Sequence, residues 1–223
     1  MYSFDDSWNY GNVPNRVPTN FDDWTYRPRS SIPSTVAIAI VAVGLTFAQA
    51  VEGGTRALAQ ALPFALAGTL AGWLVFGKPS VRVAGDGIHV VNPLATYLVP
   101  WAALILVRTR FTCTFVTPHR SVQAFAAPGP GRYAAAMATV IDLRSRRGLP
   151  NPGVADLGEL PSAPSGQVAT VVQRRWNDMA ESGSLPLGEA DETPVPRRVD
   201  VRSLVALAAL VALGIVLHWA LGS

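Results

Sequence analysis

The sequence has very little of the chemistry that catalytic and metal sites use. Its 223 residues include one cysteine and three histidines, and only 15% of the residues are charged. The single Cys113 excludes an intramolecular disulfide and a cysteine-rich metal site. The histidines, His89, His119 and His218, are far apart along the chain, so no histidine-based metal cluster is predicted. We therefore expect no metal and no cofactor.

Charge is also missing from three long apolar runs. They extend over residues 34–51, 57–76 and 203–221, and none contains an acidic or basic residue. A bilayer core about 30 Å thick needs about 20 apolar residues in a helix, with about 17 as the lower limit. The runs therefore predict three transmembrane helices, and the absence of carboxylates, lysines and arginines from them argues against an ion or proton pathway.

The basic residues that flank these runs predict an orientation. They are Arg27, Arg29, Lys78, Arg82, Arg197, Arg198 and Arg202. Because basic flanks stay on the cytoplasmic side, we place the amino-terminal tail and the central block inside the cell. The loop over 52–56 and the carboxyl terminus then lie outside the plasma membrane. Acidic residues precede the first run, whereas a cleavable signal begins with basic ones, so we expect the tail to remain on the mature protein.

Small residues in the second apolar run predict how the helices pack. Gly68 and Gly72 have the small-xxx-small spacing that lets two helix backbones approach closely. We favour an intramolecular contact with the first or third helix over dimerisation. Pro63, earlier in the same run, predicts a kink.

The block between the second and third runs, residues 78–182, has the pattern of a small β domain. Alternating apolar residues around Gly85-Asp86-Gly87 predict a β-hairpin whose two glycines take positive φ. Asn92 with the proline after it is expected to end the second strand. Trp101, directly after Pro100, is interpreted as a core residue that joins the strands.

Further strands and one helix complete this domain. Short β-type runs are predicted at 96–99, 103–109, 111–116 and 121–126. Between 167 and 180, apolar residues including Trp176 recur at helical spacing, and Trp176 is assigned to packing. The block is therefore predicted to be a small antiparallel barrel or sandwich with an amphipathic helix over one end.

Several motifs of this block occur together in one known family. They are Val81-Arg82-Val83, Asp86-Gly87-Ile88, Asn92-Pro93-Leu94, Val99-Pro100-Trp101, Ser165-Gly166-Gln167 and Arg174-Arg175-Trp176. Over roughly residues 78–180 the chain resembles the actinobacterial membrane-anchored bacterial PH-like family. The resemblance implies a PH-like (pleckstrin-homology-like) antiparallel barrel, capped by its carboxyl-terminal helix and tethered by a helix pair before it and a single helix after it. It implies no catalytic residues.

The predicted organisation has five parts. They are a disordered cytoplasmic tail over 1–33, a transmembrane hairpin over 34–77, the PH-like domain over 78–182, a linker over 183–201 and a third transmembrane helix over 202–223.

The amino-terminal tail repeats an aromatic motif. Its first copy contains Phe4, Trp8 and Tyr10, its second contains Phe21, Trp24 and Tyr26, and each copy includes a pair of aspartates. Disordered segments with spaced aromatic anchors bind by ordering on a partner, and two copies gain through effective concentration. We predict a docking motif whose receptor is either the domain of this same chain or another protein. Chance repetition and contact with the membrane interface are the alternatives.

Six arginines of the central block are candidates for contact with lipid or a partner. They are Arg108, Arg110, Arg120, Arg144, Arg146 and Arg147. Near an anionic leaflet, each well-placed cation contributes about 1 kcal/mol of attraction. The alternative is that these residues only enforce topology and solubility.

Together these patterns predict a non-enzymatic membrane protein whose PH-like domain is a scaffold or accessory subunit for a membrane protein partner at the inner face of the membrane. A module that contacts anionic membrane lipids is the first alternative. An enzyme is the less favoured one, since it requires a pocket that joins His89, Cys113 and His119. Nucleic-acid binding is not predicted, because the basic residues form neither a recognition helix nor a strand motif interleaved with aromatics.

Overall fold

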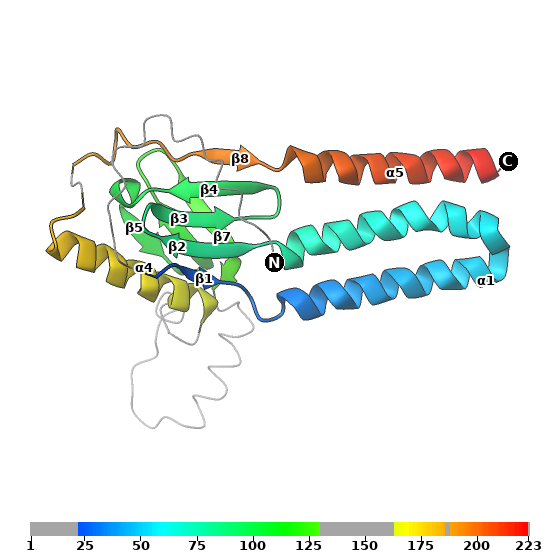
Figure 1. Ribbon diagram of the computed structural model, residues 1–223, viewed down its shortest axis with the longest axis horizontal. Coiled ribbons are helices and arrows are strands. Elements are labelled where there is room, and N and C mark those ends of the chain that lie inside the picture. The colour runs from blue at the N-terminus through cyan, green and yellow to red at the C-terminus, as the bar shows by residue number, and fades with distance from the viewer. Residues whose placement is uncertain (1–21, 130–162, 186–187, 223) are drawn as a thin grey trace, which may run out of the picture.

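The computed structural model describes residues 22–129, 163–185 and 188–222, and it places a β domain at one end of long apolar helices (Figure 1). In chain order the elements are β1 (Trp24–Tyr26), α1 (Ser31–Gly72), a π-helical turn (Trp73–Gly77), β2 (Ser80–Ala84), β3 (Gly87–Val91), β4 (Ala95–Val99), a 3-10 turn (Trp101–Ala103), β5 (Leu106–Arg108), β6 (Thr112–Val116), β7 (Ser121–Pro128), α4 (Pro164–Glu181), β8 (Arg197–Val199) and α5 (Val201–Gly222).

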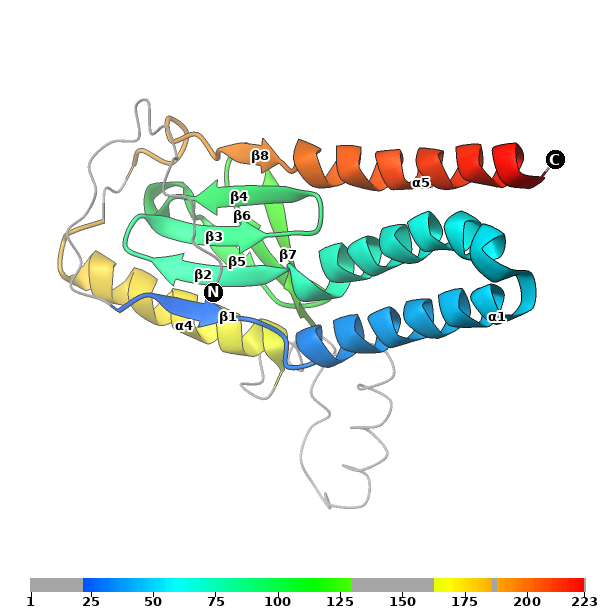
Figure 2. The ribbon, with the colours of Figure 1, turned by 45° about the vertical axis from the view of Figure 1, so that its right-hand side comes forward.

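Helices α1 and α5 are long and apolar enough to cross a membrane, by length and composition. Helix α1 is bent: Gly54 has a φ of 64°, and there the chain folds back so that two arms lie side by side (Figures 1 and 2). Glycine populates positive φ readily, which explains why the bend falls at Gly54 and not at Pro63. At 1.5 Å per residue, an arm of about 23 residues is about 34 Å long, enough for one crossing. Three crossings remain a prediction.

The two arms of α1 touch near their base and part farther along. A Cβ added to Gly72 would lie 2.8 Å from Ile38 Cδ1, whereas a Cβ at Gly68 would meet nothing within 4 Å. Gly68 instead lines a cavity of about 560 Å³ between the helices. The predicted intramolecular packing therefore involves Gly72 but not Gly68. Helix α5 joins the bundle at Gly214, against the ring of Phe64.

The β domain consists of two antiparallel sheets. One has the order β1-β2-β3-β4-β8 and the other has the order β5-β6-β7. The sheets are not joined into a closed barrel, so the predicted barrel is wrong in this respect. Strand β1 pairs with β2, and β8 pairs with β4. Both added strands come from outside residues 78–182. Because they pair with β2 and β4, neither β2 nor β4 has an edge left to pair with β5 or β7.

The hairpin between β2 and β3 is confirmed. Gly87 has a φ of 146°, but Gly85 does not have a positive φ. A Cβ at Gly87 would also lie 2.4 Å from the carbonyl oxygen of Val99, so the close approach of β4 requires glycine there as well. The predicted strand over 103–109 is shorter in the structure, because the chain first makes the 3-10 turn and β5 begins only at Leu106.

The core lies between the two sheets and α4, which packs on β6 and β7. Its fully buried members include Val81, Ile88, Val90, Val99, Cys113, Phe115, Val168 and Val172. Trp101 is 4% exposed, and its indole Nε1 donates to the carbonyl of Ala84 at 2.9 Å. Its predicted core role is confirmed.

Replacing Gly72 by valine should weaken the pairing of the two α1 arms. The new side chain would collide with Ile38, and overpacking of this kind costs about 1–3 kcal/mol. We expect a lower thermal midpoint for Gly72→Val, measured by circular dichroism on the purified chain in detergent. Gly68→Val is the matched control, because it projects into the cavity, and its midpoint should stay near that of the parent. Equal losses for both variants would contradict this packing scheme.

Candidate functional sites

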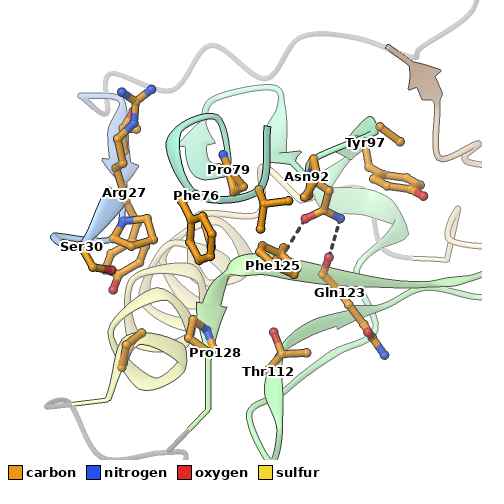
Figure 3. A pocket seen from close by; sticks show the side chains of 18 of the residues that line it. Arg27, Ser30, Phe76, Pro79, Asn92, Tyr97, Thr112, Gln123, Phe125 and Pro128 are labelled. Atoms are coloured by element: carbon orange, nitrogen blue, oxygen red, sulfur yellow. Dashed lines mark hydrogen bonds between the residues drawn. The ribbon is translucent and has the colours of Figure 1, made fainter. Parts of the chain in front are cut away.

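A cavity of about 1250 Å³ lies where the β domain meets the base of α1 (Figure 3). We call it the junction pocket. Its lining residues include Arg27, Arg29, Phe76, Asn92, Phe125 and Arg197. They come from the β1–α1 link, the π-helical turn after α1, the β3–β4 turn, β7 and β8, so the pocket forms only when these distant segments are assembled.

Asn92 bridges the two sheets at the wall of this pocket. Its Nδ2 donates to the carbonyl of Gln123 at 2.8 Å, and its Oδ1 accepts from the amide of Phe125 at 2.9 Å, as the dashed lines in Figure 3 show. The side-chain amide therefore bonds to β7 as a neighbouring strand would. The backbone amide of Asn92 also donates to the backbone carbonyl of Ala95 across the turn at 2.9 Å, which confirms the predicted turn. The bridging role had no signal in the sequence, because it depends on where β7 lies.

An ion pair ties the helix bases together beside the pocket. Lys78 Nζ lies 2.5 Å from Asp200 Oδ2 and 3.2 Å from the carbonyl of Pro93. Asp200 also caps the first turn of α5, because its Oδ1 accepts from the Ser203 amide at 3.1 Å. Burial raises the pKa of Asp200, but the hydrogen bonds from Lys78 and Ser203 and the Lys78 charge outweigh burial and lower that pKa to about 2.

The second copy of the aromatic motif is docked on the domain of its own chain. Residues 24–26 form β1, with Trp24 opposite Val83 and Tyr26 opposite Val81. The Asp23 carboxylate pairs with the Arg82 guanidinium next to this strand. This part of the predicted disordered tail is therefore a strand. Phe4, Trp8, Tyr10 and Phe21 lie outside the described residues.

Two of the candidate arginines that the structure describes lie at opposite ends of β6. Thr112 pairs with Pro128 at the end of β6 that lines the junction pocket, whereas Val116 pairs with Ser121 at the other end. Arg110 precedes the first end and Arg120 lies beside the second, about 13 Å away along a five-residue strand. Arg144, Arg146 and Arg147 lie outside the described residues.

Next to β6, an exposed aromatic accompanies the basic side chains. Phe111 is 71% exposed, and the Arg110 guanidinium lies 5.1 Å from the centre of its ring. Arg108, two residues before Arg110, is also exposed. This loop therefore combines two cations with a large apolar surface.

A second hollow, which we call the β5 groove, lies between β5 and α4. It measures about 340 Å³, and its lining residues are Leu104, Ile105, Leu106, Val107, Val172, Gln173, Trp176 and Asn177. Ile105 is 53% exposed and Leu106 is 39% exposed, although both are apolar. Among the described strands, β5 is at an edge of the three-stranded sheet. The predicted packing role of Trp176 holds, because it lies partly buried against the core, and it also borders this groove.

The three residues that an enzyme would need to bring together have separate surroundings. His89 Nε2 lies 3.0 Å from Asp86 Oδ1, and His119 Nε2 lies 2.8 Å from the carbonyl of Asp191. Cys113 lies in the core. Ile88 and Val90 point into the core, so the side chain of His89, which lies between them on β3, points to the opposite face of the first sheet. Burial raises the pKa of Cys113 to about 12. Within residues 22–129, 163–185 and 188–222, no group of three or more His, Cys, Asp or Glu side chains could hold a metal ion.

The two packed antiparallel sheets and the carboxyl-terminal helix define a PH-like domain between apolar helices. Residues 78–161 match the family described as Bacterial PH domain, so this part of the chain is similar to that family. The match supports the predicted resemblance to bacterial PH domains. It does not extend to the narrower actinobacterial group. No curated protein sequence and no solved structure matches the chain.

The stability of the helix base should depend on pH through Asp200. Its pKa is lower in the folded chain than the usual 3.8, so the stabilisation is complete above pH 4 and is lost as pH falls towards 2. The shift corresponds to about 2 kcal/mol. Denaturant unfolding in detergent at several pH values should show that Asp200→Asn is destabilised at pH 6 and much less so at pH 2. Asp178→Asn, on the exposed side of α4, is the control. A pH-independent difference for Asp200→Asn would contradict the assignment.

Cys113 should be unreactive while the domain is folded. The thiolate is the nucleophile, and burial disfavours it. We expect an aromatic disulfide reagent to label the parent chain only after denaturant is added. Ser121→Cys, which adds a thiol at an exposed strand position, should react at once and shows that the reagent works. Labelling of native parent chain at the rate of the Ser121→Cys variant would show that the core opens.

Proposed function

We propose that this chain is a non-enzymatic membrane adaptor whose PH-like domain holds a protein partner at the inner face of the plasma membrane. The two arms of α1 and helix α5 cross the membrane three times, with the β domain in the cytoplasm and the carboxyl terminus outside. The arrangement of the elements supports this orientation, since both arms and α5 meet the β domain at the same end (Figure 2). Arg27, Arg29, Lys78 and Arg197 lie at that end, as the positive-inside rule requires.

The observation that carries the adaptor role is the β5 groove. Edge strands present unpaired backbone groups, and an extended peptide can add itself to them as a further strand. Here the edge strand lies beside a hollow that Trp176 borders, and Ile105 and Leu106 are exposed along it. Exposed apolar side chains next to a strand edge favour a peptide whose alternate side chains are apolar. The occupant is therefore an extended, partly apolar segment of another protein.

The way in which the domain is fixed to the helices suits an adaptor better than a recruited module. Only Asp200 separates β8 from α5. The ion pair between Lys78 and Asp200 joins the base of the second α1 arm to the base of α5. A domain held in this way presents its groove at a constant height above the membrane. Binding therefore needs no separate recruitment step.

Lipid contact through the loop around Phe111 is the second candidate. Arg108 and Arg110 shortly precede Phe111, an aromatic that is 71% exposed, and this combination suits an anionic membrane surface. Charge reversal at Arg108 and Arg110 tests this function through liposome association. The test requires the full chain, because residues 78–182 alone lack β1 and β8.

Adding a charge to the edge of β5 should release the partner. We expect Leu106→Lys to abolish at least one reproducible membrane-protein crosslink that the parent chain gives in cells, because a lysine at a strand edge blocks pairing. The measurement is in-cell crosslinking followed by mass spectrometry of the full-length protein. Phe111→Lys, which adds the same charge in the loop between β5 and β6, outside the groove, is the control and should keep the crosslink.

A third variant separates the groove from the aromatic tail. Deletion of residues 1–21 removes the first motif copy and Phe21 of the second but leaves β1 in place. Crosslinks that survive this deletion and disappear with Leu106→Lys belong to the groove. If Leu106→Lys and Phe111→Lys give the same crosslinks as the parent chain, or if no form gives a partner, the adaptor proposal fails.

A further inference from the structure

The junction pocket lies at the depth of lipid headgroups if the helices cross the membrane as proposed above. One wall is the link from β1 to the first arm of α1, and another is Phe76 at the end of the second arm. The pocket therefore lies level with the helix bases, where an inserted helix passes from hydrocarbon to water. A ligand in it can keep an acyl chain in the membrane.

The charged groups that the structure places in the pocket wall are basic. Among residues 22–129, 163–185 and 188–222, Arg27, Arg29 and Arg197 line the pocket, and no aspartate or glutamate does. None of the ion pairs among the described residues involves these three arginines. In Figure 3 the Arg27 side chain lies at the rim and points away from Phe76. Guanidinium groups match the geometry of phosphate oxygens, so an anionic phosphate is the complementary ligand.

The remaining lining is apolar enough for the upper part of a lipid. Phe76, Leu94 and Phe125 are exposed to 46%, 47% and 52% and face this cavity. Pockets for small organic ligands usually measure about 300–1,000 Å³, so a cavity of about 1250 Å³ has room for a headgroup with its glycerol. Cations at a rim and aromatics below it reproduce the polarity gradient of a phospholipid.

The start of α4 adds to the attraction for an anion. Pro164 and Gln167, in its first turn, belong to the lining, and that turn contains no acidic residue. The amino-terminal end of a helix carries a partial positive charge that favours anions. The helix alone would define no site, but here it adds to the attraction of the arginines that line the pocket.

We propose that the junction pocket binds one anionic glycerophospholipid of the inner leaflet, with its phosphate at Arg27 and Arg29 on the β1–α1 link and its glycerol against Phe76 and Phe125. The inference depends on the membrane orientation proposed above but not on the β5 groove. The walls belong to both sheets, to the π-helical turn after α1 and to α4, so the bound lipid braces the domain against the helices.

The test is native mass spectrometry of the full chain, purified in detergent and titrated with dioleoylphosphatidylglycerol or dioleoylphosphatidylcholine. The parent chain should retain one anionic lipid in preference to the zwitterionic one. Each cation near an anionic headgroup contributes about fivefold, so replacing Arg27 and Arg29 by glutamine should weaken retention roughly 25-fold. The matched control replaces Arg56 and Arg174, which are exposed and outside the pocket, by glutamine and should bind as the parent does.

Two further measurements test the apolar part of the pocket and the identity of the ligand. Phe125→Ser keeps every charge and should weaken retention severalfold, while its far-ultraviolet circular dichroism shows that it folds. Glycerol 3-phosphate at millimolar concentration should not displace the lipid, and displacement would assign the site to a free phosphate compound. Equal retention of the two lipids, or equal retention by the two double variants, overturns the proposal. Failure of the crosslinking test leaves this result unaffected, whereas a chain that does not insert into bilayers removes both proposals.

Discussion

The ion pair between Lys78 and Asp200 determines how the β domain sits on its helices. One member follows the second arm of α1, the other caps α5, and the lysine also holds the β3–β4 turn through Pro93. Removing either member of a partly buried ion pair destabilises the folded protein, because the remaining charge then has no partner. The walls of the junction pocket and the pairing of β8 with β4 both depend on this joint.

Features that depend on neighbours in the chain could be predicted from the sequence. The Asp-Gly turn, the strand end at Asn92 and the core position of Trp101 follow from backbone preferences and side-chain size, and the structure confirms each. The bend of α1 also falls within the predicted loop, at a glycine with positive φ. Helix α4 appears where helical spacing indicated it, with bounds a few residues wider.

Features that depend on distant pairing could not be predicted in this way. Strands β1 and β8 have three residues each, too few for a visible alternation, and they exist because β2 and β4 offer open edges. Two sheets instead of a closed barrel follow from the same pairing. The β5 groove was equally hidden, since Leu104 to Val107 reads as an ordinary buried run until the edge position of β5 exposes it.

The position of β8 in the chain affects the order in which the domain can fold. The last strand of the first sheet ends at Val199, and only Asp200 separates it from α5. Domains generally fold as units during synthesis, from the amino-terminal side. Strands β1 to β4 can pair as soon as they are made, but β4 keeps an open edge until residues 197–199 have left the ribosome. Completion of the first sheet therefore comes immediately before the formation of α5.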